Sequence, residues 1–317
     1  MTRHKVLSVL GVAAALLGIY LLYRVVRRYD ADEIIEAMAA VPASTLLSVL
    51  AFTAVGYGFL IAAEYLAVRY SGKPVPFGRV ALTTVSALGI GHSIGLAALS
   101  SGAVRYRMYG RSGMDLIAVG RLIVFSGLTV AISLGTVGAA AILWQGEELA
   151  RLVGVTPTTL TTMAIIALAF VAAYFVGCLL QPPPLQIHRF RLHLPSFGLA
   201  CGQLIIGSGH LLSVSAVLYA SLRSFAETDF PTVAALYVGA DMSALVAHVP
   251  GGWGVIEYIV TNVLDGPHVL AGLIIFRASY YLLPLTIGVA IFILDEVAGR
   301  RTARRAAPSG AATRHSS

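Results

Sequence analysis

Eight long apolar segments dominate the sequence and constrain its fold more than any other feature. They run roughly over residues 6–26, 44–68, 79–99, 116–143, 159–180, 197–222, 232–249 and 268–294. Most of them have the length of about 20 residues that a helix needs to cross the hydrocarbon core of a bilayer. Only 12% of the 317 residues are charged and 57% are hydrophobic, whereas a soluble domain carries about 25% charged residues. The chain is therefore expected to be an all-α polytopic integral membrane protein, and a soluble globule, a disordered chain and a coiled coil are excluded.

The second half of the chain repeats the order of the first at a spacing of about 152 residues. The sequence GRLIVF from Gly120 resembles GLIIFR from Gly272, and the triplet SSG at 100–102 corresponds to PGG at 250–252. We expect both triplets to break a helix. These internal similarities predict a first membrane repeat at 1–152 and a second at 153–299. Residues 300–317 are expected to form a basic, disordered cytoplasmic tail.

Charge placement predicts how the segments cross. If segments 79–99 and 232–249 dip into the membrane and return on the same side, more basic residues fall on the inside, as the positive-inside rule favours. The residues that move inside are Arg105, Arg107, Arg111, Arg189 and Arg191. This arrangement has six crossing helices and two re-entrant hairpins, makes the two repeats inverted and leaves both termini cytoplasmic. The net charge of +7 reports this orientation, and we expect no nucleic acid partner.

Several shorter features complete the expected organisation. The first segment follows a basic start and precedes Arg24, without a small-residue cleavage site, which indicates an uncleaved membrane helix. Residues 30–40 predict a short amphipathic helix on the membrane surface. The stretch 253–264 is apolar but too short to cross. Cys178 and Cys201 are interpreted as small core residues.

Ionisable residues inside the apolar segments are the sharpest functional signal. Each costs at least about 2.5–3.5 kcal/mol at the bilayer centre, so each should face the interior with a partner. They are Glu64, Arg105, Arg121, Asp241, Glu257 and Arg277. Each can serve a substrate or form a structural ion pair, and Arg121 and Arg277 can also snorkel to an interface. Because Arg105 and Glu257 occupy similar places on opposite hairpins, an ion pair between them is one hypothesis.

The two breaks are candidate anion sites. A helix that begins after a break offers free N–H groups suited to a phosphate, so Ser101, Gly102, Gly251 and Gly252 join the candidate binding residues. A plain turn between helices is the alternative. His92 and His248 lie near the breaks; core packing is favoured over a proton role, and neither has a second ligand at metal spacing. We find no nucleophile elbow, phosphate loop or paired-carboxylate motif, and therefore expect no enzyme, no metal and no cofactor.

Several motifs together resemble a known family. The stretches EYLAVRYSGKPVPFGRVAL, LAALSSGAVRYRMYG, GRLIVFSGLTVAISLG, HVPGGWGVIEYIV and FRASYYLLPL are similar to the transmembrane flippase region of the lysylphosphatidylglycerol synthases, the multiple peptide resistance factors, over roughly residues 44–296. The resemblance implies a bacterial inner-membrane protein that moves aminoacyl-phosphatidylglycerol to the outer leaflet and confers resistance to cationic antimicrobial peptides. By motif position, Arg105, Asp241 and Glu257 carry over as functional charges, and Glu64 stands where the family tends to place an aspartate.

The resemblance does not extend to a soluble synthase domain, so we do not expect this chain to make the lipid. The leading function is a flippase-like translocator for a membrane phospholipid, with a separate synthase protein as a candidate partner. The alternative is a non-transporting membrane partner that anchors a lipid- or glycan-modifying enzyme through its basic C-terminus. A small-solute transporter is a third, weaker option.

Overall fold

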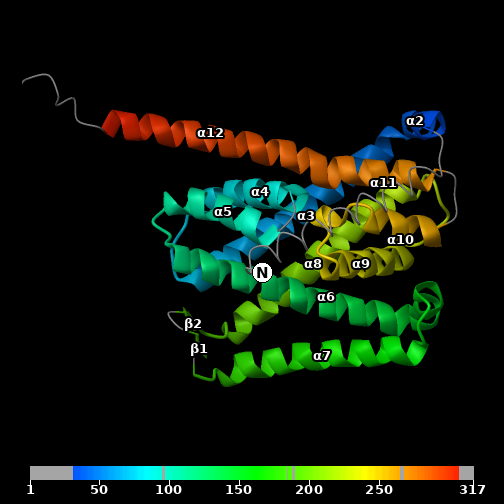
Figure 1. The fold of residues 1–317 in the computed structure, drawn as a ribbon, viewed down its shortest axis with the longest axis horizontal. Coiled ribbons are helices and arrows are strands. Elements are labelled where there is room, and N and C mark those ends of the chain that lie inside the picture. Colours follow the sequence, from blue (N-terminus) through cyan, green and yellow to red (C-terminus); the bar gives the residue numbers. More distant parts are fainter. Residues whose placement is uncertain (1–30, 95–96, 184, 188–189, 265–267, 307–317) are drawn as a thin grey trace, which may run out of the picture.

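The computed structural model describes residues 31–94, 97–183, 185–187, 190–264 and 268–306, and these form a bundle of helices (Figure 1). The first half comprises α2 (Ala31–Ala39), α3 (Ala43–Ser71), α4 (Phe77–Ile94), α5 (Ala97–Gly110), α6 (Leu116–Val153) and α7 (Pro157–Leu180). The second half comprises α8 (Phe197–Leu222), α9 (Phe230–Val246), the short turn η1 (Pro250–Gly252), α10 (Val255–Val263), α11 (Val269–Arg277), the π-helical turn η2 (Ala278–Leu282) and α12 (Leu283–Ala306). The predicted first crossing, residues 6–26, lies outside the described residues.

Five described helical stretches are long and apolar enough to cross a membrane. They are Ala43–Ser71, Leu116–Glu147, Pro157–Leu180, Phe197–Leu222 and Val269–Gly299. Neither α4 nor α9 is among them, although α9 is an apolar helix of 17 residues. The expected helical, multi-pass architecture is thereby confirmed.

Two departures from an all-helical chain of eight segments are small. Strands β1 (Leu185–Ile187) and β2 (Phe190–Leu192) form an antiparallel hairpin between α7 and α8, with Leu185 opposite Leu192. At the other end, α12 continues as a helix to Ala306, into the range 300–317 where we predict a tail. The short helix α2 (Ala31–Ala39) confirms that a helix forms within residues 30–40, and its place on the membrane surface stays a prediction.

The first predicted helix break lies earlier in the chain than expected. Helix α4 ends at Ile94 and α5 begins at Ala97, so the triplet 100–102 is helical and the prediction that it breaks a helix is wrong. Serine and glycine lower helix propensity without preventing a helix, and the Ser101 hydroxyl accepts a hydrogen bond from Arg105 one turn later. Helices α4 and α5 pack against each other as a helical hairpin.

The second predicted break is confirmed. Pro250–Gly252 forms the turn η1, and Gly251, Gly252 and Gly254 have φ angles of 59°, 62° and 78°. These left-handed values disfavour a side chain, which explains the glycines. Helices α9 and α10 form the second helical hairpin, and Figure 1 shows it in the opposite half of the bundle from α4 and α5.

Close helix contacts hold the first hairpin against α12. A Cβ atom on Gly288 would lie 2.6 Å from the carbonyl oxygen of Val85, and one on Gly89 would approach the backbone of Pro284. The α4 and α12 backbones therefore touch without intervening side chains, as small residues permit between membrane helices. At the centre of the bundle, α3 packs mainly against α8.

We expect Gly288→Ala to lower the free energy of unfolding by about 1–3 kcal/mol, the usual cost of overpacking. The reason is that the added methyl group meets the α4 backbone, which has no room to move aside. Thermal unfolding in detergent or lipid measures the change. Gly58→Ala on α3 is the control, because nothing lies within 4 Å of a Cβ atom there; equal melting temperatures for the two variants would contradict the described packing.

Candidate functional site

A cavity of about 380 Å³ lies inside the bundle where the tips of the two hairpins meet. Its wall is largely apolar and comes from both halves of the chain, with contributions from α3, α4, α5, α6, α8, α9, η1 and η2. The tips touch: a Cβ atom on Gly251 would lie 2.7 Å from the carbonyl oxygen of His92. Ligand sites in proteins commonly occupy about 300–1,000 Å³ and hold a few polar groups in an apolar wall. The polar groups of this cavity are therefore its candidate functional residues.

One buried ion pair faces the cavity. The Nε and Nη2 of Arg105 donate to the two carboxylate oxygens of Glu64 at 2.8 and 2.7 Å, and both side chains are at most 5% exposed. The hydroxyl of Tyr109 donates to Glu64 at 3.1 Å, and the Nη1 of Arg105 donates to Ser101 at 2.9 Å. A guanidinium has five N–H groups, and the described residues accept hydrogen bonds from three of those on Arg105. The two remaining N–H groups of this cavity-lining residue have no acceptor among the described residues.

A second buried ion pair lies behind the tip of the other hairpin. The Nε of Arg277 donates to Glu257 at 2.6 Å. Its Nη1 and Nη2 donate to the carbonyl oxygens of Gly251 and Gly252 at 2.6 and 2.9 Å. Its guanidinium also stacks over the rings of Trp253 and Tyr281, 4.7 and 4.5 Å from the centroids.

Glu257 in turn accepts a hydrogen bond from the backbone N–H of Gly254 at 2.8 Å, so it caps the start of α10. Arg277 and Glu257 do not line the cavity. The pair therefore holds the glycine turn of η1 in place.

These contacts correct three expectations. Arg105 and Glu257 do not pair with each other, because each has a partner on a neighbouring element of its own half, Glu64 and Arg277. Arg277 does not snorkel, since its side chain is only 4% exposed. The start of α10 already has a negative charge beside it, because the carboxylate of Glu257 accepts the N–H of Gly254 there.

Asp241 on α9 lines the cavity and differs from the paired charges. It forms no hydrogen bond and no ion pair with any described residue, and its nearest described cation in electrostatic terms is Arg277. A carboxylate in this position attracts a cation, and the cavity supplies aromatic rings beside it from Tyr237, Tyr280 and Tyr281. The cavity thus holds an arginine with free N–H groups and an unpaired aspartate.

The other predicted site residues are placed as follows. Gly251 and Gly252 line the cavity, whereas Ser101 reaches it through its bond to Arg105. Gly102 faces α6, where a Cβ atom would lie 3.0 Å from Ile123. Arg121 is half-buried on α6 outside the cavity, and its Nε has no hydrogen-bond partner among the described residues.

Three histidines line the cavity, and the sequence analysis overlooked one of them. His210 on α8 is hydrogen-bonded through Nε2 to the hydroxyl of Tyr280 at 2.7 Å, while His92 and His248 come from the hairpin tips. An ionisable residue within the apolar segment 197–222 was itself the signal that could have singled out His210. His248 also has a φ of 54°, an unusual backbone conformation next to the η1 turn.

Among the described residues, no group of three or more histidine, cysteine, aspartate or glutamate side chains is arranged to hold a metal ion. Cys178 is buried, Cys201 is half-buried, and both are free thiols.

The helical spans and the internal charged cavity define a multi-pass membrane protein. No model of a known protein family matches the sequence. The chain is 26% identical over 287 residues to the "Inner membrane protein YbhN" of Escherichia coli strain K12, and 24% identical over 284 residues to the "Uncharacterized protein slr0712" of Synechocystis sp.. Each alignment covers 88% of this chain and 88% of the relative. The similarity to the Escherichia coli relative agrees with a multi-pass membrane protein.

We expect Glu257→Gln to lower the free energy of unfolding by about 3–5 kcal/mol, because Arg277 would lose its only carboxylate partner among the described residues while staying buried. The melting temperature of the purified protein measures this. Glu227→Gln is the matched control, since Glu227 is exposed and in no described ion pair. A melting temperature unchanged in both variants would contradict the structural role of the pair.

Proposed function

We propose that the protein is a lipid translocator whose cavity binds a phospholipid headgroup on its way between leaflets. The observation that carries the proposal is the cavity at the hairpin tips, which presents free N–H groups of Arg105 and the unpaired carboxylate of Asp241 within one apolar wall. A volume of about 380 Å³ suits a headgroup and not the acyl chains, which would remain in the bilayer. The proposed activity makes and breaks no covalent bond.

The proposal includes two inverted repeats, and the element boundaries support them. Helices α3, α4 and α6 begin at Ala43, Phe77 and Leu116, and α8, α9 and α11 begin at Phe197, Phe230 and Val269. Each second member follows the first by about 153 residues. The two hairpins, α4–α5 and α9–α10, occupy equivalent places in the order and opposite halves of the bundle in Figure 1.

Charge placement supports a cytoplasmic C-terminus. Contacts of Arg79 and Arg111 with Asp295 bring the base of the first hairpin and the outer part of α12 to the same face. That face also carries Arg69 in the last turn of α3 and Lys73 in the loop that follows. The opposite face carries acidic residues of α2, of the last part of α6 and of the loop after α8, including Glu36, Glu147, Glu227 and Asp229. Under the positive-inside rule the first face is cytoplasmic.

In the proposed bound state, the lipid phosphate lies against Arg105, and a positive group on the headgroup lies against Asp241. The Glu64 carboxylate holds the guanidinium in place while the anion is bound, so the arginine is positioned without being fully neutralised. A zwitterionic or aminoacylated headgroup has both charges, and a simple anion has only one. We therefore propose a zwitterionic or aminoacyl phospholipid such as aminoacyl-phosphatidylglycerol, whose export would underlie antimicrobial peptide resistance.

We expect the purified protein in liposomes to accelerate leaflet exchange of a labelled phospholipid. Arg105→Ala should reduce the exchange rate by at least about tenfold, because a buried phosphate without its cation is unfavourable. Dithionite quenching of a fluorescent lipid measures the exchange. Arg223→Ala is the control, since Arg223 is exposed and outside the cavity. Exchange no faster than in empty vesicles, or equal rates for Arg105→Ala and the control, would contradict the proposal.

Asp241→Asn tests the headgroup class. We expect this variant to slow exchange of an amine-bearing phospholipid by about tenfold and to leave exchange of phosphatidylglycerol within about twofold of the unmodified protein. The reason is that only the amine needs the carboxylate, and asparagine preserves the size of the side chain. Parallel assays with the two labelled lipids measure this. Equal slowing of both lipids would show that Asp241 does not select a cation.

The rival function, a non-transporting anchor for a separate enzyme, makes a different prediction. It requires no leaflet exchange and requires an enzyme that co-purifies with the full chain and is lost when residues 300–317 are deleted. Exchange that survives this deletion favours the translocator.

A further inference from the structure

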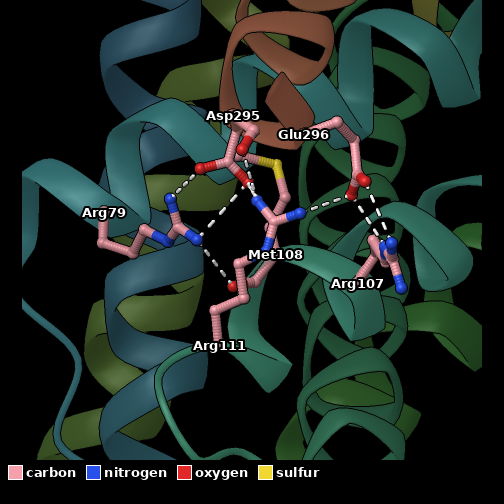
Figure 2. A network of polar contacts seen from close by, with 6 residues as sticks. All are labelled: Arg79, Arg107, Met108, Arg111, Asp295 and Glu296. Carbon is pink, nitrogen blue, oxygen red and sulfur yellow. Dashed lines mark hydrogen bonds and ion pairs between the residues drawn. The ribbon is translucent and has the colours of Figure 1, made fainter. Parts of the chain in front are cut away.

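A network of ion pairs joins the base of the first hairpin to α12, outside the cavity. Figure 2 shows Arg79 from α4, Arg107 from α5 and Arg111 from the turn directly after α5 converging on Asp295 and Glu296 of α12. Arg79 and Arg111 share Asp295, while Arg107 and Arg111 bind Glu296, both at 2.7 Å. All three cations belong to the hairpin and both anions to α12, so the network is a single contact between two bodies.

This network is more accessible than the ion pairs inside the bundle. The Arg107 and Arg111 side chains are 59% and 28% exposed, and the Asp295 and Glu296 side chains that bind them are 15% and 16% exposed, whereas Arg277 is 4% exposed. Exposed ion pairs are weak and are screened by salt, whereas enclosed pairs are not. The network can therefore break and re-form while the Glu257–Arg277 pair stays closed.

The start of α12 has two features at which helices commonly bend. Its start follows the π-helical turn η2 (Ala278–Leu282) and contains Pro284, both common sites of helix bending. Asp295 lies about 16 Å further along the axis at 1.5 Å per residue. Near its start α12 meets the α4 backbone closely at Pro284 and Gly288. Further along, Ile291 and Phe292 of α12 pack against buried side chains of the first hairpin.

The α4–α12 contact also forms one side of the cavity. Leu88 and His92 on α4 and Tyr280 and Tyr281 on η2 all line it. Separation of α4 from α12 would therefore open the cavity toward the face that carries the network.

We propose that Arg79, Arg107, Arg111, Asp295 and Glu296 form an ionic latch that closes the cavity on this face, and that its release lets α12 swing about η2 and Pro284. The function of the latch rests on the proposed translocation: it would control access to the cavity from the cytoplasmic side. Its opening is a property of the protein alone and can be measured without any transported lipid.

The test measures how fast a cavity cysteine reacts. Leu88→Cys is introduced after Cys178→Ala and Cys201→Ala, and the protein is placed in nanodiscs, where an impermeant maleimide reaches both faces. We expect Asp295→Asn with Glu296→Gln to speed labelling at least about threefold, because the latch loses its anions. Glu147→Gln with Glu227→Gln removes two exposed carboxylates at the other face and should leave the rate unchanged.

Salt provides an independent measurement on the protein with its latch intact. Raising the ionic strength from about 0.15 M to about 1 M shortens the screening length from about 8 Å to about 3 Å. This should speed labelling of the latch-intact protein. Labelling of the Asp295→Asn, Glu296→Gln protein should not change. This arm decides the question if the double variant does not fold. Labelling that is insensitive to both the variant and salt, or that rises equally in the Glu147→Gln, Glu227→Gln protein, overturns the latch. A protein that opens in this way and yet moves no lipid would overturn the translocator alone.

Discussion

An arginine enclosed in a membrane protein must keep a carboxylate beside it, and this requirement organises the interior of the bundle. A buried charge without a partner costs several kcal/mol, so Arg105 and Arg277 fix the positions of the elements that carry Glu64 and Glu257. The first pair ties α5 to α3, and the second ties α11 to the start of α10. Both hairpins are therefore held by charge, and the apolar helices pack around these fixed points.

The crossing helices could be predicted because apolar length is a local property. Helix α8 has the expected bounds, 197–222, and α3 and α7 differ from expectation by a few residues. The turn at 250–252 could also be predicted, because proline removes a backbone N–H donor and the glycines that follow permit left-handed backbone. The triplet at 100–102 lacks proline and has no positive φ angle, and local propensity alone did not determine where that helix begins.

The partners of the buried charges could not be predicted from the sequence. Arg105 and Glu64 are separated by 41 residues, and Glu257 and Arg277 by 20. Each charge had several acceptable partners at the level of the sequence, and helix packing selects among them. The equivalent positions of Arg105 and Glu257 in the two repeats suggested that they pair. In the fold, each of them instead lies next to a partner from its own half of the chain. His210 was missed for a related reason, since its hydrogen bond to Tyr280 depends on how α8 meets η2.

The two hairpins share a backbone plan and differ in chemistry, and this difference carries the functional argument. At the tip of the second hairpin, the carboxylate of Glu257 and two backbone carbonyls satisfy Arg277, which leaves a rigid wall. In the first hairpin, Arg105 keeps N–H groups for the cavity, and the base is held to α12 by exposed pairs. A rigid half opposed to a releasable half gives a bundle one fixed reference and one movable part. Two equally rigid hairpins would enclose a permanent cavity, and two equally loose ones would let water through the membrane.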